Sequence, residues 1–494
     1  MLFYTPEFLF LFLPITLFAY FLIGRFSWKA AFGWLAFASL FFYGYWNPKY
    51  LFLISGSIIF NYAGGSVLGK LRDRGLDHSA RVVFALLIIA NIGLLAHFKY
   101  LMFFAGQFGQ MFGIHWDVGL IVLPIGISFY TFTQIAYLAD VAKGKVRERS
   151  FLAYVLFVTY FPHLVAGPVL HHAEMMPQFA NRKNLKFNIN NFALGITFFS
   201  FGLFKKIVLA DGCAPIANEV FNVVSAGLPA ANAWLGATAY TLQIYYDFSG
   251  YSDMAIGLSL LFNIRLPINF NSPYRATNII DFWRRWHITL SRFLRDYLYI
   301  PLGGNRKGKW RRHVNLMTTM LLGGLWHGAN WTFLIWGGLH GLYLAINHFW
   351  RSIAATTGIG KSTGMALRIA YQMLTLIAVI VAWVFFRAGS LADALTVLSA
   401  MGGLGAHAQS GSSTITIETL AFITALLFWA MLAPNTNQIL WYNFGTQHLM
   451  TKIKDRFLWR PNIPYAILVG LIFFICAFVG VTGREKLEFL YFQF

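Results

Sequence analysis

The stretch LLGGLWHGANWTFLIWGGLHG, residues 321–341, is apolar along most of its length and carries two histidines, His327 and His340. An ionisable side chain is costly at membrane depth, so each of these histidines is a candidate functional residue. The alternative for either one is a neutral imidazole that hydrogen-bonds across a helix bundle. The stretch therefore predicts membrane helices with a polar site set among their tryptophans.

The composition of the whole chain also indicates a membrane protein. Of its 494 residues, 58% are hydrophobic and only 11% are charged, whereas soluble globular proteins carry about 25% charged residues. So many apolar side chains cannot all be buried in water-soluble cores. A soluble enzyme, a disordered chain and a secreted disulfide scaffold are therefore excluded. The two cysteines, Cys213 and Cys476, lack the spacing of metal ligands, and no metal site is expected.

Apolar stretches long enough for a bilayer recur along the chain. A hydrocarbon core needs about 20 helical residues, which predicts about eleven to thirteen membrane segments, some re-entrant or of half length. The expected fold class is all-α, a polytopic bundle of membrane helices. The first stretch lacks the basic start and cleavage site of a signal peptide and is expected to be retained. The candidate spans are residues 2–23, 31–45, 50–68, 82–104, 118–141, 151–170, 192–210, 234–262, 317–349 (in two pieces), 369–386, 415–432 and 463–481.

The basic residues lie in short loops between the apolar stretches. The formal net charge is +20, and loops rich in Lys and Arg mark the cytoplasmic side of a membrane protein. Residues 25–29, 70–81, 143–149 and 452–460 are therefore predicted to be cytoplasmic. The tail after the last span is neutral, so both chain ends are expected outside the cytoplasm. This distribution of charge argues against nucleic acid as a partner.

Residues 281–313, DFWRRWHITLSRFLRDYLYIPLGGNRKGKWRRH, are the least membrane-like part of the chain. The absence of Pro and Gly before Pro301 predicts an interfacial helix over the first half. Its arginines have two interpretations. They either snorkel toward anionic lipid or form a basic entrance that attracts a phosphate-bearing donor such as coenzyme A. The candidate donor-binding residues are Arg284, Arg285, Arg292 and Arg295.

A third histidine, His287, lies within this polar stretch, forty residues before His327. One histidine could take a proton from a hydroxyl acceptor, while the other orients a thioester or holds a developing oxyanion. Sequence alone does not bring the two together. In one continuous helix, His327 would share a face with Trp331, four residues on, but not with His340.

At these residues the chain closely resembles the membrane-bound O-acyltransferase family, in particular its bacterial branch that O-acetylates exported polysaccharides such as alginate. In that family the histidine matching His327 is catalytic, and His287 matches the second family histidine. A family element of intramembrane polar residues, expected here to pin helices together, matches Asp247, Ser249, Tyr251 and Asp253. The resemblance rests on residues 8–15, 123–132, 161–169, 245–258, 282–308 and 321–341.

The resemblance also implies the fold, the substrates and the location. It implies a helical bundle with a central tunnel or funnel, in the inner membrane of a bacterium. The donor would be acetyl-CoA or another acetyl thioester, with no permanently bound cofactor. The acetyl group would pass to an exported glycan (alginate, cellulose or another) through an extracytoplasmic SGNH-type acetyltransferase partner of the polysaccharide export machinery.

The tail EFLYFQF, residues 488–494, carries a second resemblance. It is similar to the C-terminal motif of the small membrane peptide that accompanies the D-alanyltransferase of teichoic acids. There the tyrosine is thought to carry the acyl group, which implies that Tyr491 is an acyl acceptor and completes a catalytic set with His327 and His287. The alternative is an aromatic anchor at the membrane interface. The expected organisation is a transmembrane domain, 1–482, and an extracytoplasmic tail, 483–494.

Two other classes of function compete with acyl transfer. A transporter or flippase of a polysaccharide export complex would have no chemistry of its own, and it would favour inverted repeats and broken helices. No such repeat is visible in the sequence. A structural subunit of a secretion complex would leave the histidines in Trp-rich elements without a role.

Overall fold

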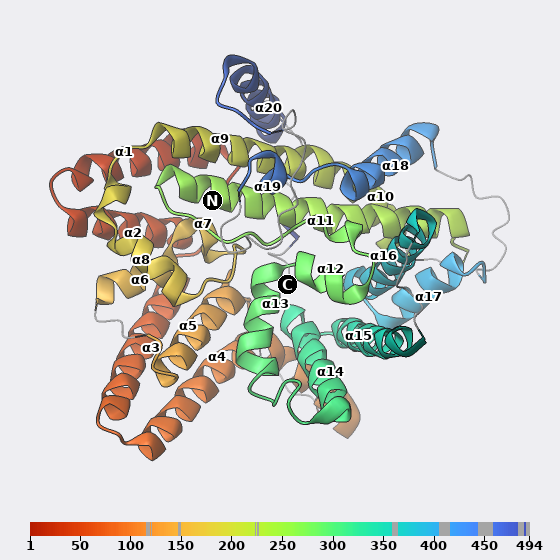
Figure 1. Cartoon of the computed structure of the whole chain (residues 1–494), viewed down its shortest axis with the longest axis horizontal. Helices are drawn as coiled ribbons and strands as arrows, with labels where there is room; N and C mark the ends of the chain where they lie inside the picture. The colour runs from red at the N-terminus through yellow and green to blue at the C-terminus, as the bar shows by residue number, and fades with distance from the viewer. Residues whose placement is uncertain are drawn as a thin grey trace.

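The computed structural model shows a bundle of helices, with no strand among the residues it describes (Figure 1). This confirms the predicted all-α class. The described residues are 1–114, 119, 121–146, 150–222, 224, 227–357, 364–404, 415–442, 458–482 and 489–490.

The helices of the N-terminal part pack in neighbouring pairs. The indole of Trp34 on α2 donates to the Thr16 carbonyl of α1 at 3.1 Å. The buried Asn61 of α3 and Asn91 of α4 exchange two amide hydrogen bonds, of 3.1 and 2.7 Å. Such reciprocal bonds satisfy polar groups that would otherwise be unpaired in an apolar bundle. The helices are α1 (Leu13–Gly24), α2 (Trp28–Gly44), α3 (Lys49–Asp73), α4 (Asp77–Phe112), α5 (Ile127–Ala142), α6 (Phe151–Thr159), α7 (Phe161–Leu164) and α8 (His172–Ala180), with π-helical η1 (Glu7–Phe12) and 3-10 helix η2 (Arg182–Leu185).

Helix α11 (Ala230–Leu261) is the centre of the bundle and is buried on nearly all sides from its third turn onward. It crosses α9 (Ile189–Phe204) at two glycine pairs, Gly195 with Gly257 and Gly202 with Gly250. A Cβ atom on any of these glycines would lie 2.5–2.8 Å from the carbonyl oxygen of its partner. Glycine is therefore required for this close approach of the two backbones. The neighbouring elements are π-helical η3 (Lys205–Ala210), α10 (Asp211–Phe221), α16 (Met365–Arg387), α17 (Leu391–Met401) and α18 (Ile417–Leu432).

Buried ion pairs tie α11 to η3. Lys206 lies 2.8 Å from both Asp247 and Asp211, and Lys205 lies 2.6 Å from Asp253. The prediction that Asp247 and Asp253 pin helices together is confirmed by these contacts. A buried charge is tolerated in an apolar bundle when an opposite charge compensates it.

We expect Lys206→Met to destabilise the protein by about 3–5 kcal/mol, because it leaves the buried carboxylate of Asp247 and the partly buried one of Asp211 without their cation. In detergent, the midpoint of heat-induced aggregation should fall by at least about 5 °C, as followed by size-exclusion chromatography after heating. The exposed Lys49 provides the control, since Lys49→Met removes a lysine without uncovering a buried partner. Equal midpoints for the two variants would contradict the role of these ion pairs.

Among the residues that the structure describes, six helical segments are long and apolar enough to cross a membrane. Two predicted spans were wrong as single helices. In the predicted span 118–141, residues 121–126 are not helical, and α5 begins only at Ile127. Residues 151–170 divide at Tyr160 into α6 and the short α7, and continue without regular structure to Leu170. The six segments are Glu7–Gly24, Lys49–Asp73, Asp77–Phe112, Ile189–Phe221, Met365–Arg387 and Ile463–Gly480.

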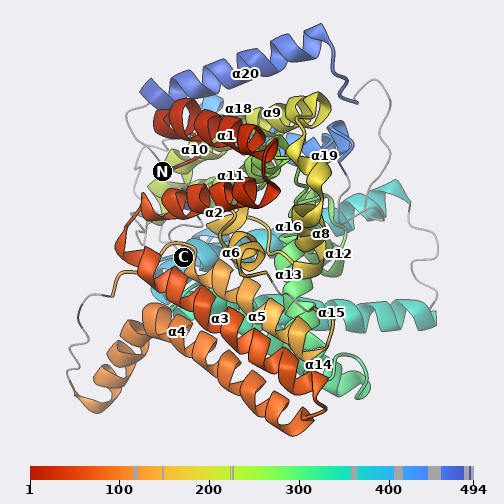
Figure 2. The ribbon, with the colours of Figure 1, turned by 90° about the vertical axis from the view of Figure 1, so that its left-hand side faces the viewer.

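The basic loops between the first helices gather at one end of the bundle, which we call the basic end. In Figure 2, α3 and α4 lie along one edge of the molecule and α20 (Ile463–Thr482) along the opposite edge. One contact joins two of the loops predicted to be cytoplasmic, and two others link such a loop to Arg182 or to Tyr297 of the polar stretch 281–313. These contacts are Arg182 over the ring of Trp28 at 5.6 Å, the Arg72 guanidinium with the Ala142 carbonyl, and Lys143 over the ring of Tyr297 at 4.9 Å.

Candidate active site

His327 is the last residue of α14 (Gly308–His327), where the chain breaks before α15 (Trp331–Thr357). Gly328 is extended, and the side chain of Asn330 accepts from the backbone N–H of Thr332 at 3.1 Å to begin the next helix. The predicted division of residues 317–349 is confirmed. Because of this break, Trp331 does not share a helix face with His327. Its indole donates instead to Gln107 of α4 at 3.1 Å.

The two helices beside His327 approach very closely. A Cβ atom on Gly324 of α14 would collide with the Phe333 carbonyl, and one on Gly337 of α15 would collide with the Met320 carbonyl. The glycines therefore bring the two backbones into contact and fix the position of the His327 end of α14 against α15.

An aromatic cage surrounds the buried imidazole of His327, which is 4% exposed. The ring centroids of Trp326, Trp336 and Phe386 lie 4.8, 5.1 and 5.0 Å from that of His327. Such a cage excludes water and holds the ring orientation. An imidazole kept in a dry, fixed position suits proton transfer to or from a bound substrate.

The structure brings His287 to the same place from another part of the chain. His287 is fully buried, and its ring lies 4.7 Å from that of Phe248 and 6.4 Å from that of Trp326. Both His287 and His327 therefore pack around Trp326. The sequence left this juxtaposition open, and only the tertiary structure provides it.

His287 also interrupts the helix that the sequence predicts up to Pro301. The chain forms α12 (Ile279–Arg285), α13 (Ile288–Leu294) and the π-helical η5 (Arg295–Tyr299), and His287 has a φ of 41° between the first two. This left-handed conformation is unfavourable for a residue with a Cβ atom. Asn269 braces the junction: its carbonyl accepts from Ile288 N at 2.9 Å and its side chain from Thr289 Oγ1 at 2.6 Å.

His340 fits the hydrogen-bonding alternative rather than a role in chemistry. Its Nδ1 atom accepts from the indole of Trp283 at 3.3 Å, which links α15 to α12. Its ring packs 4.8 Å from that of Trp336, on which His327 also lies. His340 therefore supports the cage through its contacts with Trp283 and Trp336.

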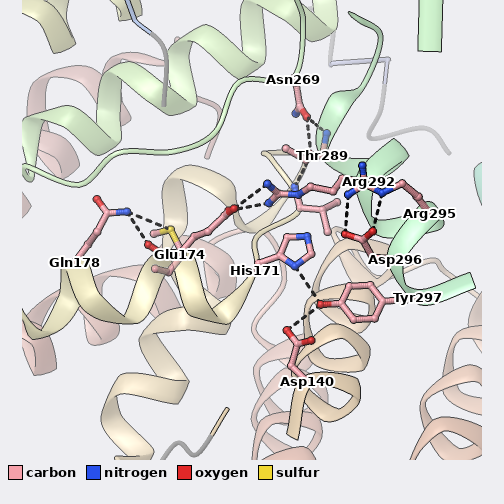
Figure 3. Close-up of polar contacts among 12 residues, drawn as sticks. Asp140, His171, Glu174, Gln178, Asn269, Thr289, Arg292, Arg295, Asp296 and Tyr297 are labelled. Atoms are coloured by element: carbon pink, nitrogen blue, oxygen red, sulfur yellow. Dashed lines mark hydrogen bonds and ion pairs between the residues drawn. The ribbon is translucent and has the colours of Figure 1, made fainter. Parts of the chain in front are cut away.

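Three of the four arginines predicted to bind the donor are held by carboxylates, and two of them are drawn in Figure 3. Arg292 forms a two-pronged ion pair with Glu174 of α8, at 2.7 and 2.8 Å. Arg295 lies 2.7 Å from Asp296, and Arg285 lies 2.9 Å from Asp281. The remaining one, Arg284, is exposed. The predicted entrance for the phosphate-bearing donor therefore has fewer unpaired positive charges than the sequence suggests.

Beside these arginines, Tyr297 joins two further polar side chains (Figure 3). Its hydroxyl donates to Asp140 at 2.9 Å and accepts from Nδ1 of His171, 3.1 Å away. Burial lowers the pKa of His171 below its usual value, and the neighbouring Arg292 lowers that pKa further. A neutral imidazole with its proton on Nδ1 makes this hydrogen bond to the Tyr297 oxygen.

Within the C-terminal tail, residues 483–494, the structure describes residues 489–490, and these pack into the bundle. Phe489 is buried, with its ring 4.9 Å from that of Tyr251 and 4.9 Å from the ammonium of Lys206. The backbone N–H of Leu490 donates to Asp247 at 3.0 Å. The next residue, Tyr491, lies outside the described residues, so its predicted role stays a prediction.

Sequence reasoning missed two residues of α4 that reach this site. Lys99 and Tyr100 donate to the carbonyls of Trp326 and Leu325, just before His327. The signal was present, because Lys99 is a charged residue inside the predicted span 82–104.

Comparison with known proteins identifies the family of this chain and several similar proteins. A family model described as "MBOAT, membrane-bound O-acyltransferase family" matches residues 84–391. A peptidoglycan O-acetyltransferase of Helicobacter pylori is 46% identical over 82% of this chain and 80% of its own length. A probable alginate O-acetylase AlgI of Pseudomonas putida is 37% identical over the full length of both chains. A teichoic acid D-alanyltransferase of Streptococcus thermophilus is 28% identical over 46% of this chain and 57% of its own.

Proposed function

Because the chain belongs to the membrane-bound O-acyltransferase family, we propose that this O-acyltransferase relays acetyl groups to an exported polysaccharide. The observation that carries the proposal is the meeting of His287 and His327 around Trp326, in a buried cage. The full-length similarity to an alginate O-acetylase and the similarity to a peptidoglycan O-acetyltransferase support acetyl as the transferred group. The acceptor is then a glycan outside the inner membrane of a bacterium.

In the proposed reaction, His327 accepts the proton of an acceptor hydroxyl as the oxygen attacks the carbonyl carbon of an acetyl thioester. The new C–O bond replaces the C–S bond, and the thiol leaves after taking up the proton. His287 orients the reacting groups. A base at a fixed position in a water-excluding cage contributes typically about 10²–10⁴-fold in rate.

The direction of transfer follows from the two ends of the bundle. The donor, acetyl-CoA or another acetyl thioester, approaches the basic end. The tail lies toward the other end, since Phe489 shares a small cavity with Met1 and Trp46. Trp46 follows α2, whose other end meets the basic loop 25–29, about 24 Å away at 1.5 Å per residue.

Tyr491 is the proposed acceptor of the acetyl group within the chain. Its neighbour Leu490 is bound by Asp247, and the next residue of α11, Phe248, packs on His287. The tail is thus held by the residue of α11 that directly precedes Phe248, the contact of His287. From Tyr491 the acetyl group would pass to the extracytoplasmic SGNH-type acetyltransferase partner of the export machinery.

The function is tested with membranes that contain the protein and [¹⁴C]acetyl-CoA. We expect covalent label on the protein, and loss of O-acetyl esters from one cell-surface glycan when the gene is deleted. Separate ester analysis of peptidoglycan and of exopolysaccharide identifies the acceptor. A transporter or flippase would leave the protein unlabelled and the extent of acetylation of the remaining polymer unchanged, and that outcome would exclude the proposal.

We expect Arg284→Gln to raise KM for the acetyl donor about fivefold with little change in kcat, since an exposed charge pair contributes about 1 kcal/mol. Arg284 is exposed and forms no ion pair within the described part of the chain, whereas Arg285 is held by Asp281 and the exposed Arg295 by Asp296. Arg285→Gln is the matched comparison and should change KM less. The difference should shrink at high ionic strength. Equal KM values for wild type and Arg284→Gln would exclude this arginine from donor binding.

A further inference from the structure

Two adjacent side chains of α4 donate hydrogen bonds to the end of α14. The ammonium of Lys99 lies 2.5 Å from the carbonyl oxygen of Trp326, and the Tyr100 hydroxyl lies 2.8 Å from that of Leu325. These carbonyls belong to the two residues that precede His327. The contacts connect parts of the chain more than two hundred residues apart, so they are a feature of the tertiary structure.

The end of α14 needs such donors. The last four carbonyls of a helix have no partner within it, and a buried helix end must find one elsewhere. Gly328 is extended and leads the chain away from the helix axis, so it does not continue the hydrogen-bond ladder. A cation at a helix C-terminus is also favoured by the helix dipole. Lys99 and Tyr100 therefore act together as a cap supplied by another helix.

Lys99 also holds the side chain of Trp326. Its ammonium lies 5.7 Å from the centre of the indole ring, within range of a cation–π contact. Trp326 is the residue on which both His287 and His327 pack. Fixing its backbone and its ring at once fixes the geometry of the histidine pair.

The surroundings of Lys99 differ from those of the structural lysine Lys206. Lys206 is compensated by two carboxylates. Within the described part of the chain, the polar partners of Lys99 are the Trp326 carbonyl and the Ser128 hydroxyl, 3.5 Å away, and both are neutral. A half-buried cation without a counter-charge inside an apolar bundle is an unfavourable way to stabilise a fold. Its placement against the candidate catalytic turn indicates a role in the site.

We propose that Lys99 and Tyr100 are positioning residues for His327. They hold the last turn of α14 so that the His327 imidazole meets the reacting groups in one orientation. Neither residue is assigned contact with the substrate. The proposal rests on the proposed function for its kinetic test, but the position of His327 can also be measured without any acyl transfer.

The test compares Lys99→Met, Lys99→Arg and Tyr100→Phe with Lys49→Met, an exposed lysine at the start of α3. We expect Lys99→Met to lower kcat for acetyl transfer about 10- to 100-fold with KM within about twofold, because small displacements of a catalytic group have effects of this size. Lys99→Arg should restore part of kcat, since it retains the charge and a donor. Tyr100→Phe should lower kcat about fivefold, the equivalent of about 1 kcal/mol for one hydrogen bond. Lys49→Met should match wild type.

The second readout is the rate at which diethyl pyrocarbonate modifies His327, followed by mass spectrometry of the purified full chain. A loosened α14 end should raise that rate at least about threefold in Lys99→Met, whereas Lys49→Met should match wild type. An unchanged kcat in Lys99→Met would overturn the proposal. So would a lowered kcat with unchanged His327 reactivity and no recovery in Lys99→Arg. A wild-type protein without acetyl transfer would instead overturn the proposed function, while a raised labelling rate would still support the cap on α14.

Discussion

Replacing His327 with alanine is expected to reduce acetyl transfer by about 1,000-fold or more, within the range that loss of a general base produces. The physical reason is that the rings of Trp326, Trp336 and Phe386 around His327 cannot take a proton, and the other histidine of the site, His287, is assigned to orienting the reacting groups. The measurement is the release of thiol from acetyl-CoA together with the O-acetyl content of the acceptor glycan. The amount of membrane-inserted protein should stay at the wild-type level.

The matched control for this variant is His340→Gln. His340 is equally buried and lies on the adjacent α15, but it bonds to the Trp283 indole, a contact that a Gln side-chain oxygen can replace. We expect it to keep most of the activity, with at most about 1 kcal/mol of lost stability. If His327→Ala retained normal transfer, His327 would not be the base. If both variants lost activity equally, the cage as a whole rather than His327 would be responsible.

Tyr491→Phe is expected to abolish acetylation of the glycan, because it removes only the hydroxyl oxygen to which the acetyl group would be esterified. Mass spectrometry of the C-terminal peptide, after incubation with acetyl donor, should find the acetyl group in wild type and not in the variant. The aromatic ring remains, so the variant keeps whatever anchoring the ring provides.

Tyr45→Phe is the control for the loss of a tyrosine hydroxyl, since Tyr45 is exposed at the end of α2. It should leave acetylation unchanged. Normal acetylation in Tyr491→Phe would reduce the tail to an anchor and remove the carrier from the relay. An Asp247→Asn variant adds a graded test, because it weakens the acceptor of the Leu490 N–H bond while keeping the Tyr491 hydroxyl.

The fold class was predictable because it depends on local composition. Apolar stretches of bilayer length, separated by basic loops, are sufficient to indicate a polytopic helical bundle. The breaks within the predicted elements were harder to place. The turn at His287 has no Pro or Gly beside it, so the usual sequence signal of a helix end is missing there, whereas Pro162 at the start of α7 does mark the division of residues 151–170 at Tyr160.

The charges of the candidate site show a similar limit. The sequence counts arginines in residues 281–313 but does not show that Glu174, from a distant helix, holds Arg292. Burial of the tail likewise depends on a contact 243 residues distant, between Leu490 and Asp247. An interfacial anchor and a docked segment have the same composition, so only packing distinguishes them.

Hydropathy, charge and continuous motifs were sufficient to predict the membrane class, the helical fold, the basic loops and His327 as a candidate. Which distant residues share the site is visible only in the tertiary structure. It placed His287 beside Trp326, brought Lys99 and Tyr100 onto the end of α14, and bound the tail at Asp247. The physical reason is that periodicity fixes only which face of a helix is apolar. Close packing at paired glycines and buried polar contacts select which helices meet, and at what depth.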